Sequence, residues 1–97
     1  MISHGFLQSE HFSPSARVVR PTGALSATAM PELRRLVSTL LSEGVRRIVI
    51  DVSGVTSIDE SAAAGLVVCA RAARAAHAIL VVTPDGRDDE ALLRRGA

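Results

Sequence analysis

The apolar residues of this 97-residue chain fall into short consecutive runs and into one segment with helical spacing. Ile48, Val49 and Ile50 are consecutive and β-branched, which is typical of a strand buried on both faces of a sheet. Residues 79–82 have the same character. Before both runs, other apolar residues recur every three or four positions and predict an amphipathic helix, namely Met30, Leu33, Leu36, Val37, Leu40 and Leu41.

Turn-forming residues mark the limits of these elements. Pro31 suits the first turn of the helix, and Gly44 stands where a helix C-terminus needs a residue that tolerates positive φ. Asp59 can accept hydrogen bonds from the free N–H groups of the Ala-rich segment that follows, which predicts the N-cap of a helix over about residues 59–76. We expect Gly65 to allow close packing of that helix. Its expected interior face is Ala62, Ala63, Leu66, Val67, Ala70 and Ala73.

The remaining signals complete an α/β pattern. Residues 17–20 and, before them, residues 5–12 are expected to form a hairpin, and Asp88 is expected to cap a last short helix. The order predicts one domain over residues 1–97, an α/β sandwich with a mixed, partly parallel sheet of about four strands and helices packed on it. Ligands and partners approach such sheets at the carboxyl ends of parallel strands, where residues 52–60 would lie.

Composition excludes several classes of function. All eleven basic residues are Arg. They are scattered along the chain, six of them as the pairs Arg34-Arg35, Arg46-Arg47 and Arg94-Arg95, and they are not gathered with aromatic residues, so nucleic acid is not expected as a partner. No apolar stretch is long enough to span a membrane, and the N-terminus lacks a targeting pattern, so the expectation is a cytoplasmic protein without direct membrane insertion. Cys69 lies in an apolar helical run and is expected to be a buried structural thiol.

The stretch IVIDVSGVTSIDESAAAGL resembles the signature of STAS domains, the family of bacterial anti-sigma factor antagonists. In that signature an apolar strand is followed by Asp-Leu-Ser, a short loop, and Ile/Met-Asp-Ser-Ser/Thr-Gly. Residues 22–26 occupy the place of the family's Gly-Glu-Leu-Asp turn, and residues 92–96 are similar to its closing Leu-Leu-x-x-x-Gly-Leu pattern, one residue shorter. The resemblance covers nearly the whole chain.

This resemblance implies a binding module that acts by partner switching. In the regulatory members, the Ser after the motif Asp is phosphorylated by an anti-sigma factor that is also a GHKL-type kinase, and only the unphosphorylated antagonist binds that kinase. The partner-binding residues implied here are Ser26, Thr56, Ser57, Asp59, Glu60, Ser61 and Ala62. A phosphate at a helix N-terminus meets free N–H groups and the positive end of the helix dipole, so the chemistry suits the position.

The chain departs from the family pattern where phosphorylation would occur. Glu60 replaces the phosphoacceptor Ser, Ser26 replaces the Asp that ends the first turn, and Ala62 replaces the Gly of the motif. If the two turns are neighbours, Glu60 could accept a hydrogen bond from Ser26. Glu60 either mimics phosphoserine or is simply a carboxylate favoured by the helix dipole. The alternative phosphoacceptors are Ser61, Ser57 and Thr56.

Other functions remain as alternatives. A STAS accessory subunit that docks on the ATPase of an ABC-type lipid transporter is the second candidate. Asp51, Asp59, Glu60 and His77 do not have a spacing that indicates a metal or acid/base centre, so we expect neither an enzyme nor a cofactor. A homodimer across the sheet edge or across the helices is left open.

Overall fold

The computed structural model describes residues 7–88 of the chain. Its strands are β1 (Leu7–Ser13), β2 (Ala16–Pro21), β3 (Gly23–Leu25), β4 (Arg47–Asp51), β5 (Val55–Ile58) and β6 (Ile79–Thr83), and its helices are α1 (Met30–Ser42), α2 (Glu60–Ala75) and the 3₁₀ turn η1 (Gly86–Asp88). These bounds confirm the predicted hairpin, both long helices and the buried strand at residues 48–50. Strand β6 forms where residues 79–82 predict a strand, but it is not buried on both faces. Ile79 is 47% exposed and Val82 is 40% exposed, because β6 is an edge strand of the sheet. The short helix predicted after Asp88 lies outside the described residues.

The strands form a mixed sheet and a separate short ribbon. The sheet has the order β1-β2-β4-β6, with β1 antiparallel to β2 and with β2, β4 and β6 parallel. The predicted mixed, partly parallel sheet of four strands is therefore confirmed. The sequence did not predict the ribbon, in which β3 pairs in parallel with β5.

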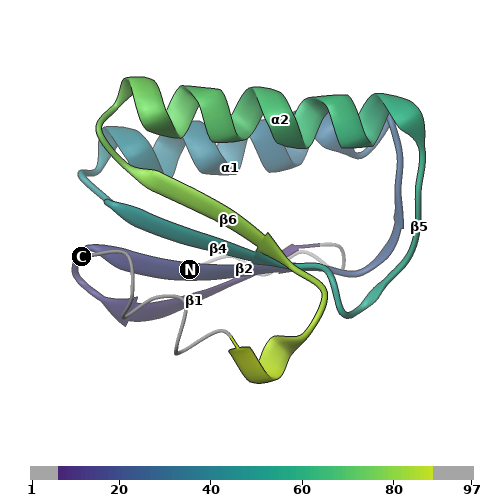
Figure 1. Cartoon of the computed structure of the whole chain (residues 1–97), viewed down its shortest axis with the longest axis horizontal. Coiled ribbons are helices and arrows are strands. Elements are labelled where there is room, and N and C mark those ends of the chain that lie inside the picture. The colour runs from purple at the N-terminus through teal and green to yellow at the C-terminus, as the bar shows by residue number, and fades with distance from the viewer. Residues whose placement is uncertain (1–6, 89–97) are drawn as a thin grey trace.

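Both long helices cover the same face of the sheet and lie side by side (Figure 1). The core between these layers comes from strands β1 to β4, from the segment before β4 and from one stripe of each helix: Leu7, Val19, Leu25, Met30, Leu33, Val37, Leu40, Val45, Ile48, Ile50, Ala62, Leu66 and Cys69. Val49 alternates with Ile48 and Ile50 and joins a second cluster with Ala16 and Val18. The central strand is thus buried on both faces, as its sequence predicts.

The buried face of α2 differs from the predicted one. The stripe that packs inward is Ala62, Leu66, Cys69 and Ala73, whereas Ala63 is exposed and Val67 is 51% exposed. Because α2 packs on α1 as well as on the sheet, its buried stripe is turned so that Cys69 lies inside. Most faces of α2 carry alanine. The sequence therefore shows too little difference between apolar and polar positions to predict which face of the helix is buried.

Gly65 sets how closely α2 approaches the start of α1. A Cβ atom at this position would lie 2.6 Å from Cε of Met30, so even a methyl group requires Met30 to move. This agrees with the expected close-packing role. Gly44 also has its expected role, since it ends α1 with a φ of 91°.

We predict that Gly65→Leu destabilises the protein by about 1–3 kcal/mol, because overpacking against Met30 outweighs the gain in helix propensity. Urea denaturation measures this change in the free energy of unfolding. Ala64→Leu is the matched control, since Ala64 is the exposed neighbour, and it should change the free energy by less than about 0.5 kcal/mol. Equal stability of the two variants would show that Gly65 does not limit the packing.

Candidate functional site

The ribbon of β3 and β5 brings two distant turns together at one end of the molecule. The Gly23 N–H donates to the Gly54 carbonyl at 3.1 Å, and the Asp59 N–H donates to the Leu25 carbonyl at 3.2 Å. Strand β3 leads into α1 and β5 leads into α2, so both long helices begin beside this ribbon (Figure 1). The turn at Ser26 and the segment from Thr56 to Ser61 are therefore neighbours, as the family resemblance implies.

The carboxylate of Asp59 connects the starts of the two helices. Its Oδ1 accepts a hydrogen bond from the Ala62 N–H at 2.7 Å, which makes Asp59 the N-cap of α2. Its Oδ2 accepts from the Ala27 N–H at 3.3 Å, in the turn before α1. The Ser26 carbonyl in turn accepts from the N–H groups of Ala29 and Met30. One side chain thus fixes the position of one turn relative to the other.

Glu60 does not make the hydrogen bond to Ser26 that the sequence suggested. In the described part of the chain no hydrogen bond joins these two residues, and the contact between the turns comes from Asp59 instead. Asp59 has extended backbone angles and a short side chain that reaches the neighbouring turn, whereas Glu60 is the exposed first residue of α2. Its carboxylate therefore faces solvent at a helix N-terminus.

The other expected binding residues divide into exposed and buried groups. Thr56, Ser57 and Ser61 are exposed, and Ser26 is partly buried. Ala62 is fully buried in the core, so it supports the site from below and cannot contact a partner directly. Ala62 was expected among the partner-binding residues, and its burial corrects that expectation. The cap at Asp59 fixes the start of α2 so that Ala62 faces the sheet.

Sequence reasoning gave no role to Ile58, although this residue belongs to the motif. Its side chain is 43% exposed at the end of β5, directly before Asp59. An exposed large apolar residue beside polar turns is a feature of protein-binding surfaces. The sequence does contain a signal for this exposure: Ile58 is an apolar residue in a short, mostly polar segment that has too few apolar neighbours to bury it.

Asp51 lies apart from Asp59 and Glu60, so these three acids do not form one metal or acid/base centre. Asp51 is 1% exposed at the end of β4, where its Oδ1 accepts from the Ser53 N–H at 2.9 Å and its Oδ2 lies 3.4 Å from Nε of Arg20. A Cβ on Gly86 would come within 2.7 Å of Oδ2, so the loop after β6 packs closely on this carboxylate. Asp51 therefore holds the ends of neighbouring strands together, apart from the Asp59 turn.

Two further observations bear on the class of site. Among residues 7–88, no group of three His, Cys, Asp or Glu side chains is placed to hold a metal ion. No helix within this same range has the length and apolar character that crossing a membrane requires. His77 is exposed at the other end of α2, remote from the turns.

We predict that Asp59→Ala lowers the free energy of unfolding by about 1–2 kcal/mol, because the N-cap and the link to Ala27 are both lost. Amide hydrogen exchange at Ala27 and Ala62 should accelerate together. Asp59→Asn is the matched control, because its one side-chain oxygen can keep the N-cap bond to Ala62 while its NH2 group cannot accept from Ala27. It should accelerate exchange at Ala27 alone and lower the free energy of unfolding by less than Asp59→Ala does. Faster exchange at Ala62 alone would contradict the connection between the two turns.

Comparison with solved structures shows the same fold. The unphosphorylated anti-sigma factor antagonist SpoIIAA matches with a TM-score of 0.69 and 21% identity, over 88% of this chain and 79% of the other. Its phosphorylated form, from Bacillus, matches with a TM-score of 0.67 and 20% identity, over 93% and 83% of the two chains. An anti-sigma factor antagonist STAS domain from Rhodobacter sphaeroides has a TM-score of 0.68 and 23% identity, over 80% and 84%.

The fold also occurs within a larger protein of another description. Mglu matches with a TM-score of 0.71 and 15% identity over 82% of this chain, but the match covers only 20% of the Mglu chain. A comparison with curated proteins gave no significant match. A family model described as "Mlab, STAS domain" matches residues 9–94. With most of its length matched by this model, and with the fold described above, the chain belongs to the STAS domain family.

Proposed function

We propose that this protein is a regulatory binding module that acts as an anti-sigma factor antagonist in the cytoplasm and binds a GHKL-type anti-sigma kinase. The observation that carries the proposal is the double hydrogen bond of Asp59 to Ala62 and Ala27. It makes the Ser26 turn and the start of α2 one continuous surface, which a single partner can contact.

The chemistry of this surface supports protein recognition over catalysis. Ile58 offers an exposed apolar contact, and the exposed hydroxyl residues Thr56, Ser57 and Ser61 lie within three positions of it in the chain. Hydroxyls, carboxylates and one apolar side chain on a fixed framework match the mixed character of protein interfaces. His77 lies at the far end of α2, so it is not placed to act as a base at this surface.

Glu60 changes how such a module is controlled. Glu60 has no hydroxyl group, so the phosphoserine ester of the family's switch cannot form at position 60. Glu60 carries one charge and two acceptor oxygens, whereas phosphoserine carries nearly two charges and three oxygens. Its place in the first turn of α2 is also one that the helix dipole favours without any signalling role. The proposed module therefore binds its partner independently of phosphorylation at this position, and Ser61, Ser57 and Thr56 are the exposed hydroxyls left for any other control.

A second function is favoured by two observations. The description of the matching family model names Mlab and no anti-sigma factor, and the phosphoacceptor Ser of the family is absent from this chain. Both suit an accessory subunit of an ABC-type lipid transporter, which would use the same surface to dock on the ATPase. The two candidates differ in the partner and agree on the binding site.

We predict that wild type and Glu60→Ser capture the same anti-sigma kinase from lysate without ATP. With ATP, only Glu60→Ser should gain one phosphate group in an intact-mass measurement and then release the kinase, because it restores a hydroxyl at the helix N-terminus. Glu60→Gln is the control, since it removes the charge without adding an acceptor. Binding to the kinase that strengthens in Glu60→Gln would identify Glu60 as a phosphoserine mimic.

Two outcomes would contradict the proposal. Capture of an ABC-type ATPase without an anti-sigma kinase would assign the protein to the transporter pathway. Retention of kinase binding by a variant with the surface disrupted, such as Ile58→Asp, would place the binding site elsewhere.

A further inference from the structure

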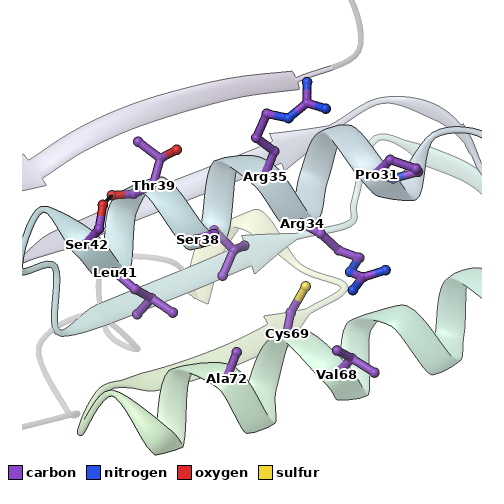
Figure 2. A pocket seen from close by; sticks show the side chains of 11 residues that line it. Pro31, Arg34, Arg35, Ser38, Thr39, Leu41, Ser42, Val68, Cys69 and Ala72 are labelled. Carbon is purple, nitrogen blue, oxygen red and sulfur yellow. Dashed lines mark hydrogen bonds between the residues drawn. The ribbon is translucent and has the colours of Figure 1, made fainter.

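A groove of about 600 Å³ lies between the two long helices, away from the turns described above. Figure 2 shows Arg34, Ser38 and Leu41 pointing from α1 toward α2, opposite Val68, Cys69 and Ala72 of α2. Val68 is 46% exposed although it lies in the middle of a helix, while Cys69 is 3% exposed. Val68 therefore forms a half-exposed apolar side of the groove, and the buried Cys69 forms its base.

The guanidinium group of Arg34 is close to the base of this groove. Burial raises the pKa of the Cys69 thiol, and the positive charge of Arg34 acts in the opposite direction. Arg35 also lines the groove, and its side chain points away from α2 in Figure 2. Among the described residues that line the groove, two are arginines and none is acidic.

The charge of the whole helical layer follows the same pattern. Arg34 and Arg35 on α1 and Arg71 and Arg74 on α2 are all exposed. The carboxylates of these two helices, Glu32 and Glu60, both lie in first turns. Among the described residues, Arg34 is the charged group that lines the groove and points toward α2, so it complements an acidic side chain beside an apolar surface.

We propose that this groove binds an acidic amphipathic helix of a partner protein. The apolar stripe of that helix would pack on Leu41, Val68 and Ala72, and a carboxylate next to the stripe would pair with Arg34. Two adjacent helices offer a third helix a ready groove for side chains spaced by three and four residues. The groove is recessed between helices, which suits an inserted helix better than the flat surface of an anionic membrane.

This interaction is independent of the proposed function. The Ser26 turn and the start of α2 form the end of the helical layer, whereas the groove runs along its side. A partner can use one surface without the other, so a failure of either proposal leaves the second intact. Glu60→Ser distinguishes them, because it alters the turn and leaves every residue of the groove unchanged.

The test is selection from a displayed library of roughly 14-residue helices, long enough for the groove, in which acidic, neutral and basic members are equally represented. Selection on the wild-type protein should enrich helices with an apolar stripe flanked by Glu or Asp. Val68→Asp and Arg34→Glu should each weaken the selected peptides roughly tenfold or more. Val67→Asp and Arg71→Glu are matched controls, since they make the same changes on exposed residues outside the groove, and they should weaken binding by no more than about twofold.

Three results would overturn the inference. The first is the absence of enriched acidic helices. The second is loss of binding in Val67→Asp or Arg71→Glu equal to the loss in the groove variants. The third is binding to vesicles of phosphatidylcholine and phosphatidylglycerol that depends on Val68 and Arg34, which would assign the groove to a membrane surface. Circular dichroism of each variant shows that a lost interaction does not come from unfolding.

Discussion

The parallel pairing of β3 with β5, completed by the carboxylate of Asp59, is the interaction on which the site depends. The paired segments are far apart in the chain, and each leads directly into one of the two helices that cover the sheet. Asp59 caps α2 and also accepts a hydrogen bond from the turn before α1. Without this connection the two turns would be separate loops, and the polar residues on them would not form a single surface.

Local sequence patterns predicted most of the helices and strands. They did not predict the contacts between segments that are far apart in the chain. The buried strand β4, the end of α1 at Gly44 and the N-cap at Asp59 each depend on a few consecutive residues with strong preferences. The ribbon was missed because β3 has three residues and β5 has four, too few to give a periodic pattern, and because their pairing joins distant segments. The rotation of α2 was missed because alanine on most of its faces provides little contrast between inside and outside. A hydrogen bond from Ser26 to Glu60 is one hypothesis that the sequence allows, but the contact between the turns is made by Asp59, since backbone angles decide which carboxylate reaches the neighbouring turn.

The fold by itself does not establish what the protein binds. Similar folds occur in SpoIIAA and in a small part of Mglu, so the functional argument depends on the residues at the helix starts. There Asp59 connects the two turns, and Glu60 is the exposed first residue of α2. In the proposed function, the connected turns bind the partner and Glu60 places a fixed charge where the family has its switch Ser. The groove between the helices is separate from both.

Hydrogen–deuterium exchange on the complex with the captured partner tests the central claim most directly, because it reports each backbone segment separately. If the Ser26 turn and the start of α2 form one surface, protection should increase at Ala27 and at residues 56–61 together when the partner binds. Protection confined to one of these two segments, or found only at the exposed edge of β6, would contradict the claim.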